Sequence, residues 1–249
     1  MTRFAGVSST DRPQPTVRIF TDFDGTVTRE DVGEALLRHF STDEDIDATL
    51  ERWSRGEVNA AETYQRLYAA APHLTESALD AFLVGFEIDP SFARFVDWCR
   101  EHRYPLTVLS DGFDAYIERL LRRAAVEVEV KANRMRLGEG APELDFPYTD
   151  RRCPQLAHCK SNHVALLSQD EDLVIYVGDG SSDFEAAGFA DMVFARGPLE
   201  NWCQEHNITF RRFYSFTTVR DILSALIDQR KLRPKKRAQV LRRQLWSTG

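Results

Sequence analysis

The sequence lacks any long apolar stretch: its uninterrupted hydrophobic runs, such as the one around residues 81–84, reach only about six residues. A membrane-spanning helix needs about 20 apolar residues, so we do not expect the chain to cross a membrane. The first 16 residues also lack the apolar segment of a secretory signal peptide. The sequence contains neither an internal repeat nor a low-complexity tract. These absences favour an ordinary folded protein of the cytoplasm.

Cysteine is scarce, with four residues in a chain of 249. Without a secretion signal, we expect these cysteines to be reduced thiols. Two of them, Cys153 and Cys159, are separated only by the segment Pro154–His158. Their spacing does not match a four-ligand zinc site, although histidines lie nearby. Ordinary thiols are therefore favoured over a metal or redox site.

The net charge of −7 conceals an uneven distribution of charged residues. Eight of the 32 basic residues lie between Gln229 and Gly249, where there is no acidic residue. The rest of the chain, with 24 basic against 39 acidic residues, therefore carries −15. A body this acidic argues against nucleic acid as the main partner. A solvated terminal helix is the favoured explanation of the basic tail, ahead of a nucleic-acid or membrane contact.

Strand-like and helix-like segments alternate along most of the chain. Short β-branched or apolar runs predict strands, and apolar residues spaced three or four apart predict helices. Their alternation predicts an α/β fold, with a doubly wound parallel sheet covered by helices on both faces. We expect strands at residues 17–21, 106–110, 126–130, 173–177 and 192–195, core helices at residues 92–102, 115–124, 162–168 and 219–227, and a hairpin or irregular excursion within residues 131–150.

The pattern between the first two expected strands is entirely helical. From residue 31 to about residue 86, apolar residues recur at helical spacing, and breaks at Gly56 and Pro72 divide the block into about four helices. Ser41–Thr42 and Thr75 are the expected N-caps. A block of this length is too long for a loop. We therefore expect a core formed by residues 1–30 and 91–249, and an inserted all-helical cap formed by residues 31–90.

The first expected strand ends in two acidic residues, Asp22 and Asp24. Strand periodicity sends both carboxylates to one side, while Phe23 between them points the other way. Gly25 then allows the backbone to leave the strand. Two carboxylates this close are unfavourable unless a cation lies between them or one carries a proton. An ordinary turn also explains Asp before Gly, so only the later segments of the chain can favour a functional site over a turn.

Three later segments place reactive side chains at or near other strand ends. Ser110 ends the second strand, and Lys160 precedes a helix, with Lys131 as a more distant alternative. Asp179 and Asp183 lie in a glycine-rich stretch after the strand at residues 173–177. Sites in parallel α/β sheets form beyond the carboxyl ends of the strands, so we expect these side chains to converge. Carboxylate oxygens suit Mg²⁺, and the serine hydroxyl with the backbone N–H groups after it suits phosphate.

Taken in order, these segments resemble the signature of the haloacid dehalogenase-like (HAD) phosphatases, over roughly residues 17–227. The resemblance implies a Rossmann-like core, a bound Mg²⁺ and a reaction through an aspartyl-phosphate. It implies that Asp22 is the nucleophile and Asp24 the general acid and base. Ser110 and Lys160 complete the implied catalytic set. The implied metal ligands are Asp22, Asp24 through its backbone carbonyl, Asp179 and Asp183.

A cap in this position is similar to that of the phosphoserine-phosphatase-like branch, within which the motifs resemble most the phosphatases of methionine salvage. Phosphoserine, phosphoethanolamine or phosphocholine phosphatases are alternatives, as is a phosphotransferase to a small acceptor alcohol. A binding protein without turnover is disfavoured because the implied catalytic set is intact. A helical lid favours a small phosphorylated metabolite over a polymer. We expect substrate contacts from Thr26, Asp31, Arg66, Asp111 and Gly112.

Overall fold

The computed structural model describes residues 16–246, so the leader expected over residues 1–16 lies almost wholly outside the described part. Within that part, one sheet has the strand order β4-β3-β2-β1-β5-β6-β7. All neighbouring strands are parallel except β4, which is antiparallel to β3. The strands are β1 (Val17–Thr21), β2 (Leu106–Phe113), β3 (Glu129–Arg136), β4 (Glu143–Asp145), β5 (Leu173–Gly178), β6 (Met192–Ala195) and β7 (Phe210–Arg212).

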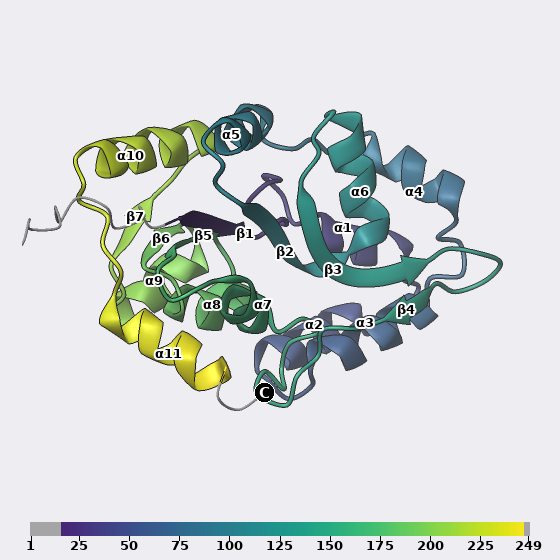
Figure 1. The fold of residues 1–249 in the computed structure, drawn as a ribbon. Helices are drawn as coiled ribbons and strands as arrows, with labels where there is room; N and C mark the ends of the chain where they lie inside the picture. Colours follow the sequence, from purple (N-terminus) through teal and green to yellow (C-terminus); the bar gives the residue numbers. More distant parts are fainter. Residues whose placement is uncertain (1–15, 247–249) are drawn as a thin grey trace, which may run out of the picture.

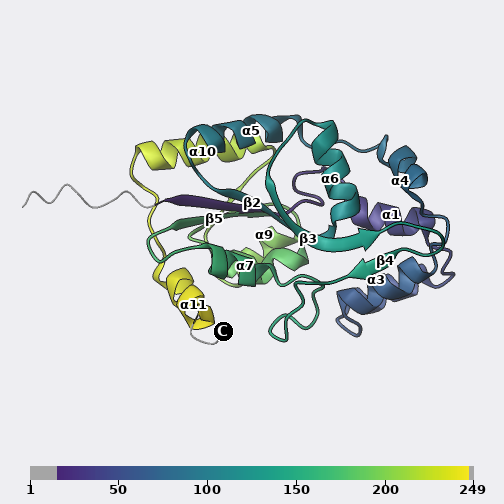
Figure 2. The same ribbon diagram turned by 45° about the vertical axis from the view of Figure 1, so that its right-hand side comes forward.

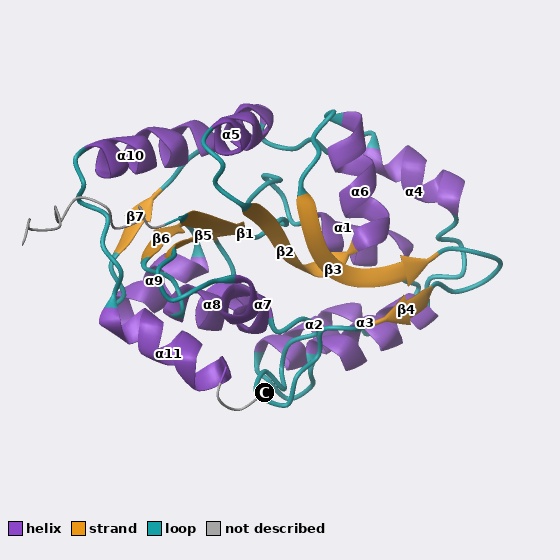
Figure 3. Cartoon of the chain, in the orientation of Figure 1, coloured by secondary structure: helices purple, strands orange, loops and turns teal. Residues whose placement is uncertain are grey.

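Helices cover both faces of this sheet, as the views in Figures 1 and 3 show. The prediction of a doubly wound α/β fold is therefore confirmed. Among residues 16–246, no helix is both long and apolar enough to span a bilayer. The core helices are α5 (Pro90–Glu101), α6 (Asp114–Arg123), α7 (Lys160–Leu167), α8 (Phe184–Gly188), α9 (Pro198–Glu205), α10 (Phe216–Asp228) and α11 (Lys236–Trp246).

Alternate residues of the central strands are buried on opposite faces of the sheet. Ile19 packs in a cluster with α5 and α10, whereas Phe20 packs in a second cluster with α7, α8 and α9. On the neighbouring strand β5, Ile175 and Tyr176 divide in the same way. Period-two side-chain orientation explains this division. Because both faces are covered, β1 and β5 read as nearly continuous apolar runs.

Four helices come after β1 and lie together at one end of the sheet (Figures 1 and 2). Thr28 and Ile88, at the two ends of this helical block, pair as an antiparallel bridge. Thr75 is the N-cap of the fourth helix, as predicted. Ser41 instead lies after the first helix, and Asp45 precedes the second, so the N-cap expected at Ser41–Thr42 is wrong. The helices are α1 (Val32–Phe40), α2 (Ile46–Ser54), α3 (Ala60–Ala69) and α4 (Glu76–Leu83).

Strand β2 does not end at Ser110, as the sequence suggested, but continues to Phe113. Its register against β3 shifts between Leu109 and Phe113, so the intervening residues form a bulge. The side-chain amide of Asn133 donates a hydrogen bond to the backbone carbonyl of Asp111 (2.8 Å) and holds this bulge. Bulges redirect side chains next to functional sites. Here the bulge carries Ser110 and Asp111, and α6 begins only at Asp114.

Other elements also differ from the sequence-based expectation. Strand β3 begins at Glu129 instead of residue 126, and β7 and α9 were not predicted. The hairpin expected within residues 131–150 is confirmed as the antiparallel pair of β3 and β4. The basic tail forms α11, which packs against α7 and is not simply a solvated helix. Arg242 is fully buried and donates to a carboxylate oxygen of buried Asp191 (3.3 Å). A burial this deep requires such a partner for the charge.

Candidate active site

The ammonium group of Lys160 lies between two buried carboxylates. Its Nζ donates to Oδ1 of Asp22 (2.6 Å), to Oδ1 of Asp183 (2.7 Å) and to the hydroxyl of Ser182 (2.9 Å). Asp22 comes directly after β1, and Lys160 is the first residue of α7. Burial alone lowers the pKa of Lys160, but the charges and hydrogen bonds of Asp183 and Asp22 outweigh it and raise this pKa. Lys160 is therefore a fixed positive charge.

Asp183 is saturated with hydrogen bonds. One of its oxygens accepts from Lys160 and from the hydroxyl of Tyr176 (2.7 Å). The other accepts from the backbone N–H groups of Asp179 (3.0 Å) and Gly180 (3.1 Å). A Cβ atom on Gly178 would lie 2.4 Å from that second oxygen, so only glycine fits there. Asp183 thus orients Lys160 and shapes the glycine-rich turn after β5.

Asp179 completes a group of three carboxylates. Ligand oxygens of Asp22, Asp179 and Asp183 all lie within 4.8 Å of one another. The hydroxyl of Thr26 donates to Oδ1 of Asp179 (2.6 Å). Gly25 has φ = +70°, and a Cβ atom there would lie 2.4 Å from Oδ2 of Asp179. The three carboxylates offer an all-oxygen donor set, the kind of ligand that Mg²⁺ prefers.

Asp24 also follows β1, and its two carboxylate oxygens accept hydrogen bonds from different kinds of donor. Oδ1 accepts from the backbone N–H groups of Val32 (3.1 Å) and Gly33 (3.3 Å), at the start of α1. Oδ2 accepts from the hydroxyls of Tyr116 (2.5 Å) and Ser110 (3.4 Å). Burial, and after it the negative charge of Asp31, raises the pKa of Asp24 to about 7. A carboxyl group with this pKa can both give and take a proton near neutral pH.

Ser110 and Asp111 occupy the bulge of β2. The hydroxyl of Ser110 accepts from the N–H group of Gly112 (3.0 Å). The carbonyl of Ser110 accepts from Nδ1 of buried His158 (2.7 Å). Burial, then the nearby His163 ring, lowers the pKa of His158 to about 3, so this imidazole stays neutral. The loop before Lys160 is thereby tied to the phosphate-binding candidate Ser110.

Four of the predicted catalytic and metal-binding residues, Asp22, Asp24, Ser110 and Asp179, line a cavity of about 130 Å³, whereas Lys160 and Asp183 lie behind its wall. Asp31, Asp111 and Gly112 line it, so the structure brings these three substrate-contact candidates to the site. Thr26 is buried against Asp179 and does not line it. Arg66 is not brought to the site either: it is half exposed and forms an ion pair with Asp43 (2.8 Å). The complete lining is Asp22, Asp24, Asp31, Gly33, Trp53, Tyr64, Ser110, Asp111, Gly112, Tyr116, Asp179, Gly180, Ser181 and Ser182.

Comparison with known proteins identifies the family. The family model of the haloacid dehalogenase-like hydrolases matches residues 19–188, which covers more than half of the chain. The chain belongs to this family. The predicted resemblance is therefore confirmed, and the match establishes the hydrolase class.

Two relatives with similar sequences are named as phosphatases. The phosphatase of 2-hydroxy-3-keto-5-methylthiopentenyl-1-phosphate from Bacillus cytotoxicus is 27% identical over 85% of this chain and 98% of its own length. The protein of the same name from Bacillus cereus is 28% identical over the same shares. A phosphoserine phosphatase solved as a phospho-aspartyl intermediate analogue has a TM-score of 0.62 at 14% identity, over 85% of this chain and 99% of that one. A probable phosphoserine phosphatase from Vibrio cholerae has a TM-score of 0.67 at 19% identity, over 89% and 70%. The family and the two Bacillus relatives together support a phosphomonoesterase, and the two solved structures share the fold.

Several residues of the hydrolase's site were not singled out from the sequence. Tyr116, Trp53 and Tyr64 line the cavity from three different helices. Aromatic residues at helical spacing look like ordinary core residues, so no sequence signal separates them. Arg196 donates from Nη2 to the backbone carbonyls of Gly25, Thr26 and Thr28 and holds the loop that carries Asp24. The stretch of residues 194–196 belongs to the sequence resemblance, but the resemblance assigned Arg196 no role.

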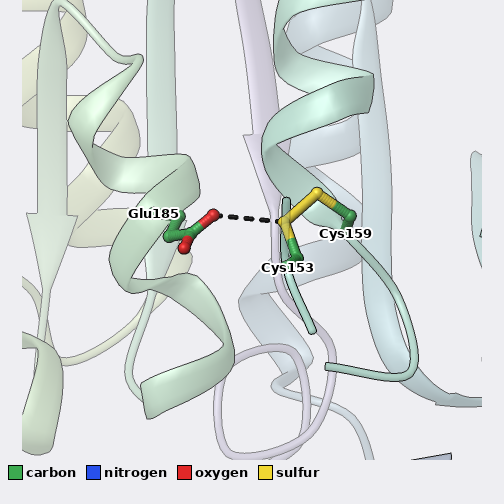
Figure 4. Close-up of side chains that lie close together, drawn as sticks. All are labelled: Cys153, Cys159 and Glu185. Atoms are coloured by element: carbon green, nitrogen blue, oxygen red, sulfur yellow. Dashed lines mark hydrogen bonds between the residues drawn. A yellow bond between two sulfur atoms is a disulfide. The ribbon is translucent and has the colours of Figure 1, made fainter. Parts of the chain in front are cut away.

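The expectation of four reduced thiols is wrong for one pair. Cys153 and Cys159 form a disulfide, whereas Cys99 and Cys203 are buried free thiols. The turn after Cys153 brings the two Cα atoms to 5.6 Å, a separation that a disulfide spans. Figure 4 shows the carboxylate of Glu185 beside Cys153 Sγ, at 3.1 Å. The bridge closes the loop that ends at Lys160.

The raised pKa of Asp24 predicts a pH-dependent difference between the wild type and Asp24→Asn. The folded state holds the Asp24 proton up to about pH 7, while the unfolded state loses it near 3.8. This contribution to stability is therefore fully present below pH 3.8 and lost as pH rises to about 7. Asparagine mimics the protonated group, so the variant should gain at least about 3 °C in Tm relative to wild type between pH 4.5 and 7.5.

Thermal unfolding with a metal chelator present measures this difference, and the titrating groups that do not interact with Asp24 cancel because both proteins contain them. A difference in Tm that stays constant, or that shifts toward the wild type as pH rises, would contradict the assignment.

Proposed function

We propose that this hydrolase is a Mg²⁺-dependent phosphomonoesterase that acts on a small phosphorylated metabolite through an aspartyl-phosphate on Asp22. The observation that carries the proposal is the convergence of Lys160 with the carboxylates of Asp22, Asp179 and Asp183 beside one cavity. A nucleophile, a fixed cation and a metal-binding donor set are the parts that phosphoryl transfer requires.

In the proposed first step, a carboxylate oxygen of Asp22 attacks the phosphorus, and the bond between phosphorus and the ester oxygen breaks. Asp24 gives its proton to that leaving oxygen. In the second step, Asp24 takes a proton from water as the water oxygen attacks the phosphorus. The bond between phosphorus and the Asp22 oxygen then breaks, which releases phosphate and regenerates the carboxylate. Ser110 holds a phosphate oxygen, and the charge of Lys160 balances the charges of the phosphate and Asp22. Asp22, Asp179 and the carbonyl of Asp24, with Asp183 behind them, would hold Mg²⁺, whose positive charge would keep Asp22 ionised and offset the phosphate charge.

We also propose that residues 31–90 act as a cap over this site. Trp53 of α2 and Tyr64 of α3 line the cavity together with Asp22 and Asp24, which follow β1. The Thr28–Ile88 bridge joins the two connections between this helical block and the rest of the chain. A closed cap excludes water from the aspartyl-phosphate until the leaving group has departed. A cytoplasmic location remains part of this proposal.

The names of the Bacillus relatives favour 2-hydroxy-3-keto-5-methylthiopentenyl-1-phosphate as the substrate. This ester would agree with the resemblance to the phosphatases of methionine salvage. A phosphotransferase would use the same intermediate and differ only in the acceptor, so product analysis with small alcohols distinguishes the two.

A specific observation favours an amine-bearing substrate as a second candidate. Asp111 is buried, lines the cavity, and its Oδ1 has no hydrogen-bond partner among the described residues. Burial, opposed by the charge of Lys160, raises the pKa of Asp111 to about 6, so it is mainly ionised at pH 7.5. Asp31, Trp53 and Tyr64 are nearby lining residues, and no Lys or Arg among residues 16–246 lines the cavity. Acidic and aromatic walls suit an ammonium group, as in phosphoserine, phosphoethanolamine or phosphocholine.

The main proposal predicts that Asp22→Asn abolishes turnover of 4-nitrophenyl phosphate. We expect kcat to fall by about 10⁴-fold or more, because the nucleophile is removed. A chelator should also abolish wild-type activity, and added Mg²⁺ should restore it. The matched variant Asp221→Asn, at an exposed residue paired with Arg220, should keep full activity. A metal-independent wild type, or Asp22→Asn with a tenth of normal kcat, would exclude the proposed mechanism.

The second candidate predicts that wild type prefers phosphoethanolamine to ethyl phosphate and that Asp111→Asn removes the preference. Loss of one charged contact to the amine should raise KM for phosphoethanolamine about 10-fold. The kcat/KM for ethyl phosphate should change less than about threefold, since that ester has no ammonium group. Asp97→Asn, at an exposed residue, is the control. Equal effects on both esters would reject an amine-binding role for Asp111.

A further inference from the structure

The hydroxyl of Tyr116 makes the shortest contact to Asp24. Tyr116 lies in the first turn of α6, its side chain is fully buried, and its ring packs beside Phe23 with 6.3 Å between ring centroids. From this position its hydroxyl lies 2.5 Å from Oδ2 of Asp24. Tyr116 also lines the cavity into which Asp24 faces. The hydroxyl of Tyr116 therefore lies at the boundary between the core and the cavity.

Two glycines make room for this hydroxyl. A Cβ atom on Gly112 would lie 1.7 Å from the tyrosine oxygen and 2.9 Å from Oδ2 of Asp24. A Cβ atom on Gly33 would lie 3.1 Å from the same tyrosine oxygen. Real Cβ atoms do not approach heavy atoms to 1.7 Å, so a side chain at residue 112 is incompatible with the Tyr116–Asp24 contact. The bulge of β2 and the start of α1 both leave this space.

The other oxygen of Asp24 determines where its proton is carried. Oδ1 accepts from the backbone N–H groups of Val32 and Gly33, which can donate but cannot accept. A proton on Oδ1 would face these donors, so a protonated Asp24 carries its proton on Oδ2. That oxygen faces the hydroxyls of Tyr116 and Ser110. A hydroxyl can donate to the ionised carboxylate and accept from the protonated one.

We infer that Tyr116 is a positioning residue that holds Oδ2 of Asp24 in one place in both protonation states. This inference rests on the proposed function, in which Asp24 alternates between acid and base. A backbone N–H group in place of Tyr116 would favour only the ionised form, whereas a hydroxyl serves both. Burial raises the pKa of Tyr116 well above its ordinary value, so the tyrosine keeps its own proton and does not replace Asp24 as the acid.

The test compares two phosphate esters of nearly the same shape, phenyl phosphate and 4-nitrophenyl phosphate, in the magnesium-loaded full-length enzyme. Phenolate is the more basic leaving group and needs a proton from Asp24, whereas 4-nitrophenolate departs without one. The kcat/KM value reports steps up to the departure of the phenol, which isolates the acid role. Tyr116→Phe should lower kcat/KM for phenyl phosphate about 30-fold, which is less than the whole contribution of a general acid. The kcat/KM for 4-nitrophenyl phosphate should fall less than about threefold.

Tyr68→Phe is the matched control. Tyr68 is also fully buried, but its hydroxyl has no hydrogen-bond partner among residues 16–246, so both kcat/KM values should stay within about twofold. The ratio of the two values in one preparation does not depend on how much of the variant is folded. An unchanged ratio in Tyr116→Phe would overturn the inference, whether activity on both esters falls equally or not at all. A wild type that hydrolyses neither ester would instead reject the proposed function.

Discussion

The fold depends on one buried ion network, in which Lys160 lies between Asp22 and Asp183. Removing a single partner from such a network would leave an uncompensated buried charge, which costs about 3–5 kcal/mol. The three residues come from the end of β1, the start of α7 and the turn after β5. Correct docking of these elements is therefore required before the charges can be buried. The same docking brings the carboxylates of Asp22, Asp179 and Asp183 together beside the cavity.

Features encoded within short segments could be predicted from the sequence. The bounds of β1 and β6 agree with the prediction, because apolar runs bounded by Asp, Gly and polar residues define them locally. The aspartates after β1 and β5 were predictable because parallel strands carry their sites at one end. Asp31 was recognised from its place in the motif, and it lines the cavity.

Features that depend on distant parts of the chain could not be predicted. The bulge of β2 contains a hydrogen bond from Asn133 of the neighbouring strand, and Tyr116 contacts Asp24 only because the fold brings α6 to the end of β1. The guanidinium group of Arg66 could bind an anionic substrate, but in the fold it pairs with Asp43 and does not line the cavity. The bridge between Cys153 and Cys159 depends on a turn whose geometry the spacing did not reveal.

The central claim is that a phosphoryl group and Mg²⁺ meet between Asp22, Asp179 and Lys160. Its most direct test is a crystal structure of the full-length enzyme with Mg²⁺ and beryllofluoride, which mimics a phosphoryl group on a carboxylate. We predict beryllofluoride on an Oδ atom of Asp22, Mg²⁺ within about 2.1 Å of Asp22 and Asp179 oxygens, and Lys160 Nζ within hydrogen-bond distance of a fluoride. Beryllofluoride on another residue, or a metal ion that does not contact Asp179, would contradict the claim.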